Sequence, residues 1–347
     1  MRAVVRRSEI TIDLGALRRN VVRLSEAAAS AELWAVVKAD AYGHGALDCG
    51  RVALEAGASA LCVATVQEGE ELRDAHPSAR IVVMGPLAPG EDRLAREARL
   101  EVTVSGSELP EGLPLHLKVD TGMGRWGMPP EELERVPTGR VVGLMSHLAT
   151  ADEADPGFAR EQIERFAALA ERFPGTVRHL ANSAGTLRFP EARFDAVRCG
   201  VALYGLSPFG DDPGLLHGLE PVLSWRSYVA QTKTLAVGES TGYARRFRAE
   251  RATRIGLVPV GYADGFRRAL TGTEVLVDGA RRRVVGAVSM DAFAVELEDE
   301  QAGAPVSIIG DGVLAEEHAR HMGTINYEVT CAISVVPGRA DRSVTDG

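Results

Sequence analysis

The feature that most constrains the fold is a series of eight short apolar runs rich in valine and isoleucine, separated by segments with helical spacing. Such runs alternate with amphipathic helices when the strands form a parallel sheet. Eight strand–helix repeats are the number that closes a (β/α)8 barrel of the TIM type. We therefore predict an N-terminal α/β barrel. Its predicted strands cover residues 33–37, 60–64, 81–84, 101–104, 115–119, 141–146, 177–181 and 194–198.

The pattern changes after about residue 219, where short alternating segments replace the strand–helix repeats. Residues 275–279 (VLVDG) are typical of a β-hairpin, because an Asp-Gly pair follows an apolar run. Residues 314–322 are the main segment with helical spacing in this part of the chain. The C-terminal part is therefore predicted to be a mostly β domain.

These patterns predict a barrel domain over residues 1–218 and a β domain over residues 219–347. The segment 207–218 contains the glycines and prolines that are typical of a linker. A further predicted strand at residues 9–14 either starts the barrel or pairs with the C-terminal domain. The sequence alone does not assign residues 1–12 to one domain or the other.

The charge balance excludes several classes of partner. Against 48 acidic residues the chain has 39 lysines and arginines, a net charge of −9, which disfavours binding to nucleic acid or to an anionic membrane. No apolar run has the length of a signal peptide or a membrane span. The four cysteines lack the short spacings of a zinc site or a disulfide framework. We therefore expect a cytoplasmic protein without a metal site.

Polar side chains stand where several of the predicted barrel strands end. Functional residues of such barrels lie at the carboxyl ends of strands, because the loops there line one mouth. Each residue alone has an ordinary explanation as a capping or solvated group, but together they predict one active-site pocket. The residues are Lys38, Lys118, His147, Asn182, Ser183 and Arg198.

The segment AVVKADAYGHG at residues 35–45 resembles the signature of alanine racemases around their cofactor-binding lysine. The resemblance covers nearly the whole chain in ordered blocks. The family has an N-terminal barrel and a C-terminal β domain, in agreement with the fold predicted above. The further blocks are LKVDTGMGR (117–125), SHLATAD (146–152), NS (182–183), VRCGVALYG (197–205), VGYADGF (260–266), SMD (289–291) and INYE (325–328).

The resemblance implies an isomerase that interconverts L-alanine and D-alanine by two-base α-proton exchange with pyridoxal 5'-phosphate. Breaking an α C–H bond requires an electron sink, which this cofactor supplies through a Schiff base to a lysine. Lys38 is implied to be that lysine and also the acid/base group on one face of the substrate. Tyr243 is implied to serve the opposite face, and the family takes this tyrosine from the second subunit of a homodimer.

The resemblance also implies which residues hold the cofactor. Arg198 matches an arginine that donates to the pyridine nitrogen, and a permanently cationic donor would discourage protonation of that nitrogen. His147 would support this arginine and the ring. The remaining cofactor contacts are implied for Tyr42, Asn182, Ser183, Gly200, Val201 and Tyr327.

Substrate contacts follow from the same resemblance. Arg125 and the backbone N–H of Met290 would bind the substrate carboxylate, since guanidinium and carboxylate pair in a bidentate manner. Lys118 matches a lysine that many members carry as a carbamate, an anion that would hold Arg125. Tyr262 and Asp291 resemble residues of a narrow entrance formed by the partner subunit.

One segment departs from the family pattern. The last strand usually ends in an RVPR-type sequence, whereas residues 334–339 read SVVPGR, so we expect a shorter final strand.

Three other functions fit parts of the pattern. A racemase of the same fold could act on serine or on several amino acids. A non-catalytic pyridoxal-phosphate carrier shares the lysine-bearing barrel, but it typically lacks the β domain and the tyrosine at 243. A decarboxylase of this architecture would use a cysteine in the second domain, and no cysteine is near Tyr243 in the sequence.

Overall fold

The computed structural model describes residues 6–106, 108–136, 140–210 and 218–346, and the chain divides into two compact units. The barrel unit contains Leu17–Phe209 and the segment that ends at Glu220. The β unit combines the chain up to Ala16 with residues from Pro221 onward. Most of the predicted linker, residues 211–217, lies outside the described residues. Within the described part, no helix has the length and apolar character needed to cross a bilayer.

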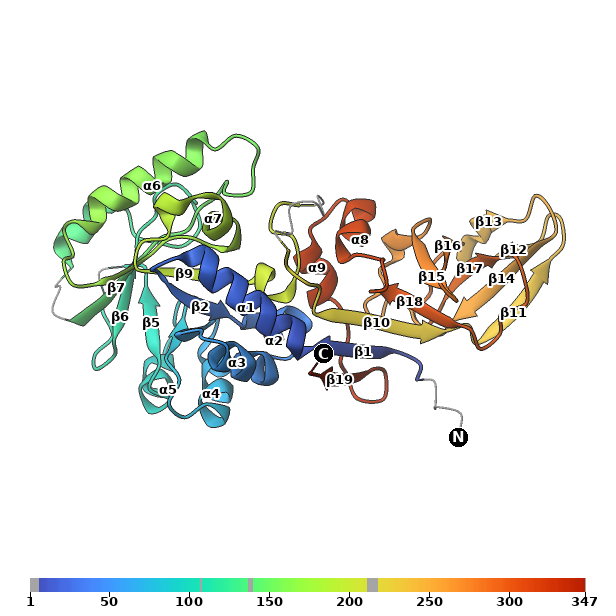
Figure 1. Cartoon of the computed structure of the whole chain (residues 1–347), viewed down its shortest axis with the longest axis horizontal. Coiled ribbons are helices and arrows are strands. Elements are labelled where there is room, and N and C mark those ends of the chain that lie inside the picture. The colour runs from blue at the N-terminus through green and yellow to red at the C-terminus, as the bar shows by residue number, and fades with distance from the viewer. Residues whose placement is uncertain (1–5, 107, 137–139, 211–217, 347) are drawn as a thin grey trace. The chain divides into compact units, whose positions relative to one another are not determined.

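The barrel unit is a closed ring of eight parallel strands, which confirms the predicted fold (Figure 1). Each strand pairs with the next one in sequence, and β9 closes the ring against β2. The last run was predicted from residue 194, but Phe194 has a φ of 46° and β9 begins at Ala196. The strands are β2 (Glu32–Val36), β3 (Ala60–Val63), β4 (Ile81–Val83), β5 (Glu101–Val104), β6 (Leu115–Lys118), β7 (Val141–Met145), β8 (Val177–His179) and β9 (Ala196–Cys199).

Helices connect the barrel strands and lie outside the ring (Figure 1). The helix after β3 begins with a capping box, in which Thr65 and Glu68 satisfy each other's backbone N–H groups. The elements are α1 (Leu14–Ala28), α2 (Lys38–Gly43), α3 (Ala46–Glu55), α4 (Val66–Ala75), α5 (Glu91–Glu97), α6 (Gly157–Ala170), α7 (Ser183–Arg188) and the 3-10 helices η1 (Pro130–Arg135), η3 (Pro190–Ala192) and η4 (Val201–Tyr204).

The interior of this barrel contains polar side chains. Successive side chains of a strand point to opposite faces, so Leu115 and Leu117 of β6 face away from His116 and Lys118. The His116 ring contacts His179 of β8, which places both rings inside the barrel. TIM barrels usually fill this space with branched apolar residues. The polar filling therefore requires a specific hydrogen-bonding arrangement.

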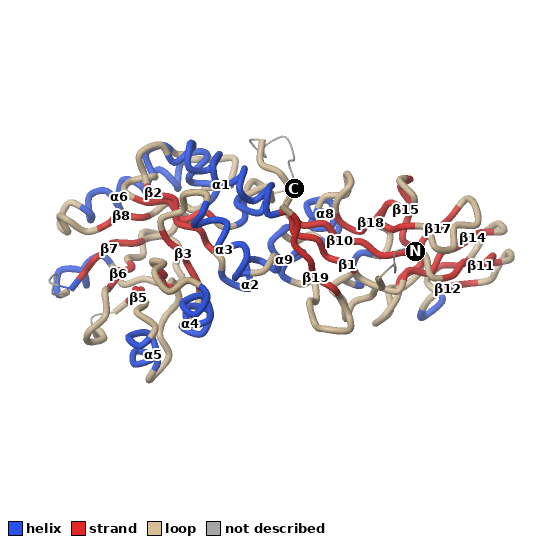
Figure 2. Tube along the Cα trace, turned by 60° about the horizontal axis from the view of Figure 1, so that its bottom comes forward, coloured by secondary structure: helices blue, strands red, loops and turns tan. Residues whose placement is uncertain are grey.

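The β unit is built on a nine-stranded sheet in the order β11-β14-β17-β16-β15-β18-β10-β1-β19. Its strands run side by side in Figure 2. The N-terminal strand β1 (Glu9–Asp13) pairs antiparallel with β10 and parallel with β19, so it belongs to this sheet and not to the barrel. The other strands are β10 (Leu223–Tyr228), β11 (Gln231–Leu235), β14 (Thr253–Val258), β15 (Glu274–Val277), β16 (Ala280–Val285), β17 (Phe293–Leu297), β18 (Pro305–Ile309) and β19 (Asp341–Thr345).

Local sequence explains the smaller features of the β unit. The predicted hairpin joins β15 to β16 through Asp278 and Gly279, which both have positive φ as a tight two-residue turn requires. The predicted helix is α8 (Ala315–Met322), and α9 (Asn326–Cys331) follows it. Strands β12 (Ser240–Thr241) and β13 (Phe247–Arg248) form a separate small ribbon.

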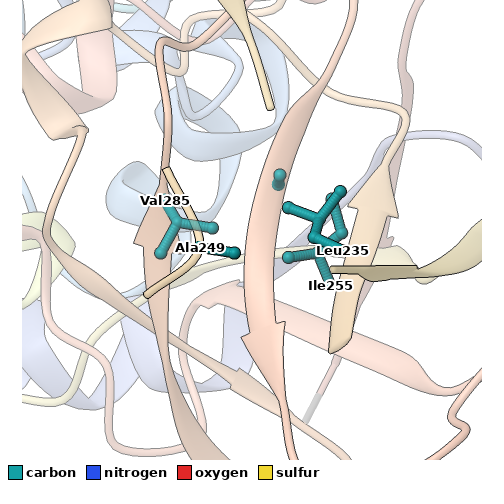
Figure 3. Close-up of a cluster of buried hydrophobic side chains, with 5 residues drawn as sticks. Leu235, Ala249, Ile255 and Val285 are labelled. Atoms are coloured by element: carbon teal, nitrogen blue, oxygen red, sulfur yellow. The ribbon is translucent and has the colours of Figure 1, made fainter. Parts of the chain in front are cut away.

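One end of the sheet has its own small apolar core, drawn in Figure 3. The cluster is partly covered by Phe247 and Leu257. This core supports the ribbon β12–β13, which carries the turn that begins at Tyr243. The buried members are Leu235, Ala249, Ile255, Val285 and Ala294.

A buried carboxylate joins distant parts of the β unit. The Asp264 side chain is inaccessible to solvent and accepts hydrogen bonds from Arg7 at 2.9 and 3.0 Å and from Arg339 at 3.0 Å. Residues 334–339 contain no strand, and β19 begins only at Asp341, beyond the SVVPGR segment. The atypical C-terminal segment thus ends in an arginine that reaches the buried carboxylate, and the final strand follows it.

Candidate active site

Lys38 stands just beyond β2, where the chain makes an unusual turn. The four residues 39–42 have φ values of 52°, 50°, 54° and 57°, all in the left-handed region. This conformation costs a non-glycine residue about 1–2 kcal/mol. Strain of this kind persists only where the surrounding structure holds it, and it is typical of functional sites.

Two carboxylates hold this turn. Glu68 of α4 accepts hydrogen bonds from the backbone N–H groups of Ala39 at 2.8 Å and Ala64 at 2.7 Å. Asp40 accepts from the N–H of Ala46 at 2.8 Å. Glu68 was not among the predicted site residues, although its capping-box spacing after Thr65 is visible in the sequence.

Arg198 is buried at the end of β9, with its guanidinium surrounded by acceptors. It donates to the carbonyl oxygens of His179 at 2.6 Å, Ser146 at 2.8 Å and Leu180 at 3.0 Å. Within the described residues no carboxylate pairs with it, which argues against a simple structural ion pair. Burial lowers the pKa of Arg198 to about 10, so the guanidinium remains protonated at neutral pH.

His147 lies on the other side of this guanidinium. Arg198 donates to its Nδ1 at 3.4 Å, and because arginine has no acceptor, the His147 proton must be on Nε2. Burial and the charge of Arg198 hold the pKa of His147 well below its usual value, so the ring is neutral.

Positive groups converge at this end of the barrel. Burial, together with the charges of Arg198, Arg125 and Lys38, lowers the pKa of Lys118 to about 8, and the charge of Asp120 opposes them. The Asp120 carboxylate is engaged by its own loop, since it accepts from the N–H groups of residues 122–124 at 2.8 to 3.2 Å. This loop leads to the exposed Arg125. The region is therefore suited to an anionic ligand.

A second cluster joins the loops after β8 and β9. Asn182 caps α7 by accepting from the N–H of Gly185 at 2.8 Å. The Ser183 hydroxyl accepts from the N–H of Gly200 at 3.0 Å, in the loop that leads to Val201. A Cβ at Gly200 would lie 2.5 Å from the Tyr42 hydroxyl, so the tyrosine ring would have to shift if any other residue stood there.

The β unit carries the remaining predicted residues. Tyr243 begins η6 (Tyr243–Arg245) with its side chain 70% exposed, beside a hollow of about 390 Å³ that Thr241 and Ser289 also line. Tyr327 is half-buried in the first turn of α9.

The structure brings Tyr262, Met290 and Asp291 together at one place on the β unit. The N–H of Tyr262 donates to Ser289 at 3.0 Å, and the N–H of the following Ala263 donates to Met290 at 3.1 Å. Met290 is 51% exposed. Asp291 accepts from Arg339 at 2.8 Å, which fixes its carboxylate on this surface.

Comparisons with known proteins cover both units. Residues 12–208 match the family described as "Alanine racemase, N-terminal domain", and residues 222–340 match "Alanine racemase, C-terminal domain". The chain is 39% identical to "Alanine racemase 1" of Bacillus subtilis over 93% of this chain and 90% of that protein.

Two solved structures have the same fold throughout. An alanine racemase from Bacillus anthracis with bound L-Ala-P superposes with a TM-score of 0.89 at 36% identity, covering 99% of this chain and 96% of the other. An alanine racemase from Bartonella henselae with covalently bound pyridoxal phosphate superposes with a TM-score of 0.88 at 26% identity, covering 97% and 99%. The chain therefore belongs to the alanine racemase family.

Proposed function

We propose that this chain interconverts L-alanine and D-alanine, with pyridoxal phosphate bound to Lys38. The observation that carries the proposal is the convergence of Lys38, Lys118 and Arg198 at one end of the barrel, where the Asp120 carboxylate is engaged by the N–H groups of its own loop. This donor set fits an anionic, aromatic cofactor. The covalently bound pyridoxal phosphate of the Bartonella relative and the L-Ala-P of the Bacillus anthracis relative support the same assignment.

When bound, pyridoxal phosphate supplies the electron sink that makes an α-proton acidic enough to remove. Lys38 would hold it covalently, and Arg198 would donate to its ring nitrogen. Because Arg198 is a fixed donor, it would keep that nitrogen unprotonated. His147, held neutral beside Arg198, would support the ring. The proposed contacts to the phosphate and its surroundings come from Tyr42, Asn182, Ser183, Gly200, Val201 and Tyr327.

Racemisation needs one proton-transfer group on each face of the substrate. We assign Lys38 to one face and Tyr243 to the other. Arg125 and the N–H of Met290 would fix the substrate carboxylate, which leaves the α-carbon between the two bases. Tyr262 and Asp291 would narrow the entrance so that only small side chains pass.

Lys118 is proposed to carry a carbamate. Its burial lowers the pKa to about 8, so about a tenth of the amine is neutral at pH 7, far more than for an ordinary lysine, and only the neutral amine reacts with carbon dioxide. The resulting anion would neutralise the surrounding cations and hold Arg125. Mass spectrometry at alkaline pH, compared with an acid-treated sample, tests this modification.

We also propose a homodimer with shared active sites. Tyr243, Met290 and Tyr262 are 70%, 51% and 38% exposed, which is unusual for large apolar groups and suits a surface that a second copy covers. The negative net charge disfavours nucleic acid and anionic membranes as partners of this protein. A cytoplasmic location and a role in supplying D-alanine belong to the same proposal.

The first experiment incubates the purified chain with pyridoxal phosphate and L-alanine or L-serine, and follows the D-enantiomer by chiral chromatography. D-alanine formation well above D-serine formation is expected. A Lys38→Ala variant should lose both the activity and the absorbance of the lysine-bound cofactor. No D-product, with lysine-bound cofactor still present, would favour the carrier or the decarboxylase.

The shared site has its own test. Tyr243→Phe should lose α-deuterium exchange from mainly one enantiomer, and equal losses from both would contradict the two-base assignment. Mixing Lys38→Ala with Tyr243→Phe should restore about a quarter of the sites, because random exchange makes half of the dimers mixed and each has one intact site. No recovery despite proven subunit exchange would rule out shared sites.

A further inference from the structure

A continuous series of buried hydrogen bonds runs through the interior of the barrel. It starts at Arg198, whose Nη1 lies 2.9 Å from Nδ1 of His179. Nε2 of His179 lies 2.8 Å from Nδ1 of His116, and Nε2 of His116 lies 2.7 Å from Oε2 of Glu101. The series joins the carboxyl end of β9 to the first residue of β5, which is at the opposite end of its strand.

The chemistry of the two ends fixes every proton in this series. Arginine only donates, so Nδ1 of His179 accepts and the His179 proton is on Nε2. That N–H donates to Nδ1 of His116, which places the His116 proton on Nε2, where it donates to Glu101. A carboxylate only accepts, so both ends impose the same direction. A second proton on either ring would bring two donors face to face.

The charged groups around the rings are consistent with neutral histidines. Burial lowers the pKa of His116 in spite of the Glu101 carboxylate, and burial with its cationic neighbours holds the pKa of His179 well below the usual value. Burial alone would raise the pKa of Glu101, but hydrogen bonds from His116 and Arg80 outweigh it and lower the pKa. The charged groups that act on the two rings are Glu101, Arg80, Lys118 and Arg198.

The surrounding residues are shaped to fit these rings. A Cβ at Gly143 of β7 would lie 2.1 Å from Nδ1 of His116, so any other residue there would displace the ring. Trp34 packs edge-on against His116 with centroids 5.8 Å apart, and it lies 4.6 Å from the His179 ring. Arg80 covers the other end by binding Glu101 at 2.9 Å and lying over the Trp34 ring.

We propose that His179, His116 and Glu101 are positioning residues for Arg198, forming a directional hydrogen-bond relay that fixes its guanidinium and supplies its distant counter-charge. The relay rests on the proposed function, in which Arg198 donates to the cofactor ring. In the described part, Glu101 is the carboxylate that this series of hydrogen bonds connects to Arg198. Removing the middle of the relay leaves the Nε2–H of His179 without its acceptor, so that Arg198 alone holds the tautomer, and a shift of the proton to Nδ1 would oppose the guanidinium.

The proton order is measured directly by NMR of the holoenzyme labelled with 15N-histidine. We expect both rings to be neutral, with the proton on Nε2, from pH 6 to pH 8. A proton on Nδ1 of either ring, or a ring that titrates near pH 6.5, would overturn the relay. This measurement requires no activity, so it decides the relay even if the chain does not racemise alanine.

Variants at position 116 test the positioning role. Glutamine can accept from His179 and donate to Glu101 through one amide, whereas leucine can do neither. We expect His116→Leu to lower kcat about tenfold, with less change in KM, because mutating a residue that orients a site residue typically costs activity on this scale. The NMR signal of His179 should also shift. His116→Gln should restore most of the rate and the His179 tautomer.

Leu117→Ala is the matched control, because Leu117 is equally buried in β6 but faces away from the rings. Leu117→Ala should lower the stability of the barrel. It should leave the NMR signal of His179, kcat and KM unchanged. Equal effects of His116→Leu and Leu117→Ala in an enzyme that racemises alanine would overturn the positioning role and leave the proposed function intact. The positioning role would also be overturned if His116→Gln lost as much of the rate as His116→Leu does.

Discussion

The buried His318 should make the stability of the β unit sensitive to acid. This residue lies in α8 with its side chain completely buried, and its ring packs edge-on against Phe266 at a centroid distance of 6.0 Å. Within the described residues, neither ring nitrogen has a hydrogen-bond partner. Burial lowers the pKa of His318 to about 4, because the lost hydration of the cation outweighs the attraction of the nearby Glu317 carboxylate.

The sign and size of the effect follow from linkage between protonation and folding. The unfolded chain binds this proton near pH 6.5 and the folded chain near pH 4, so acid favours unfolding. Above pH 6.5 the ring is neutral in both states and the full free energy of unfolding is present. That free energy falls as the pH is lowered from 6.5 to 4. At about 1.4 kcal/mol per pH unit, the total loss is about 3 kcal/mol, of which about 2 kcal/mol is lost by pH 5.

The assay is urea unfolding at pH 7.5 and pH 5, at one protein concentration because a dimer's stability depends on it. His318→Leu should remove about 2 kcal/mol of the difference between the two pH values, and it removes two unpaired polar atoms as well. His321→Leu is the control, since His321 is exposed three residues later in the same helix. An unchanged pH dependence in His318→Leu would refute the reasoning.

Three further substitutions test other contacts. Asp264→Ala should destabilise the β unit by about 3 kcal/mol, because Arg7 and Arg339 lose a buried partner, and thermal melting measures this. Glu68→Ala releases the left-handed turn after Lys38 and should weaken cofactor binding about tenfold in a spectral titration, and the loss of the α4 capping box should also cost about 1 kcal/mol of unfolding free energy. Gly200→Ala places a methyl against the Tyr42 hydroxyl, and it should cost about 1–3 kcal/mol in cofactor binding in the same titration, whereas an unchanged affinity would show that this hydroxyl moves freely.

The barrel could be predicted from sequence because its strands are buried on both faces. Such strands are short, continuous apolar runs, and the helices between them have their own period. The position of β1 could not be predicted, because its partners β10 and β19 lie more than two hundred residues away in sequence. Pairing over that distance leaves no local signal in residues 9–14.

The candidate site was predictable where a polar residue interrupts an apolar pattern at the end of a strand, as at Lys38 and Arg198. The left-handed turn at residues 39–42 was not, because none of them is a glycine and the conformation is imposed by Glu68 from another helix. Only the three-dimensional structure shows that this carboxylate bonds the turn.

The two buried histidines show what a strand pattern alone can and cannot reveal. In β6 the order Leu115, His116, Leu117, Lys118 alternates as in a half-exposed strand, although every side chain is buried. An alternating strand inside a closed barrel means that the inner face is polar. Buried polar groups are costly unless each has a partner. The alternation therefore predicts partners on neighbouring strands, and His179 and Glu101 are those partners. Polar alternation in a barrel strand is thus a sequence signal for an internal hydrogen-bond network, and Gly143 beside it marks the space that the ring requires.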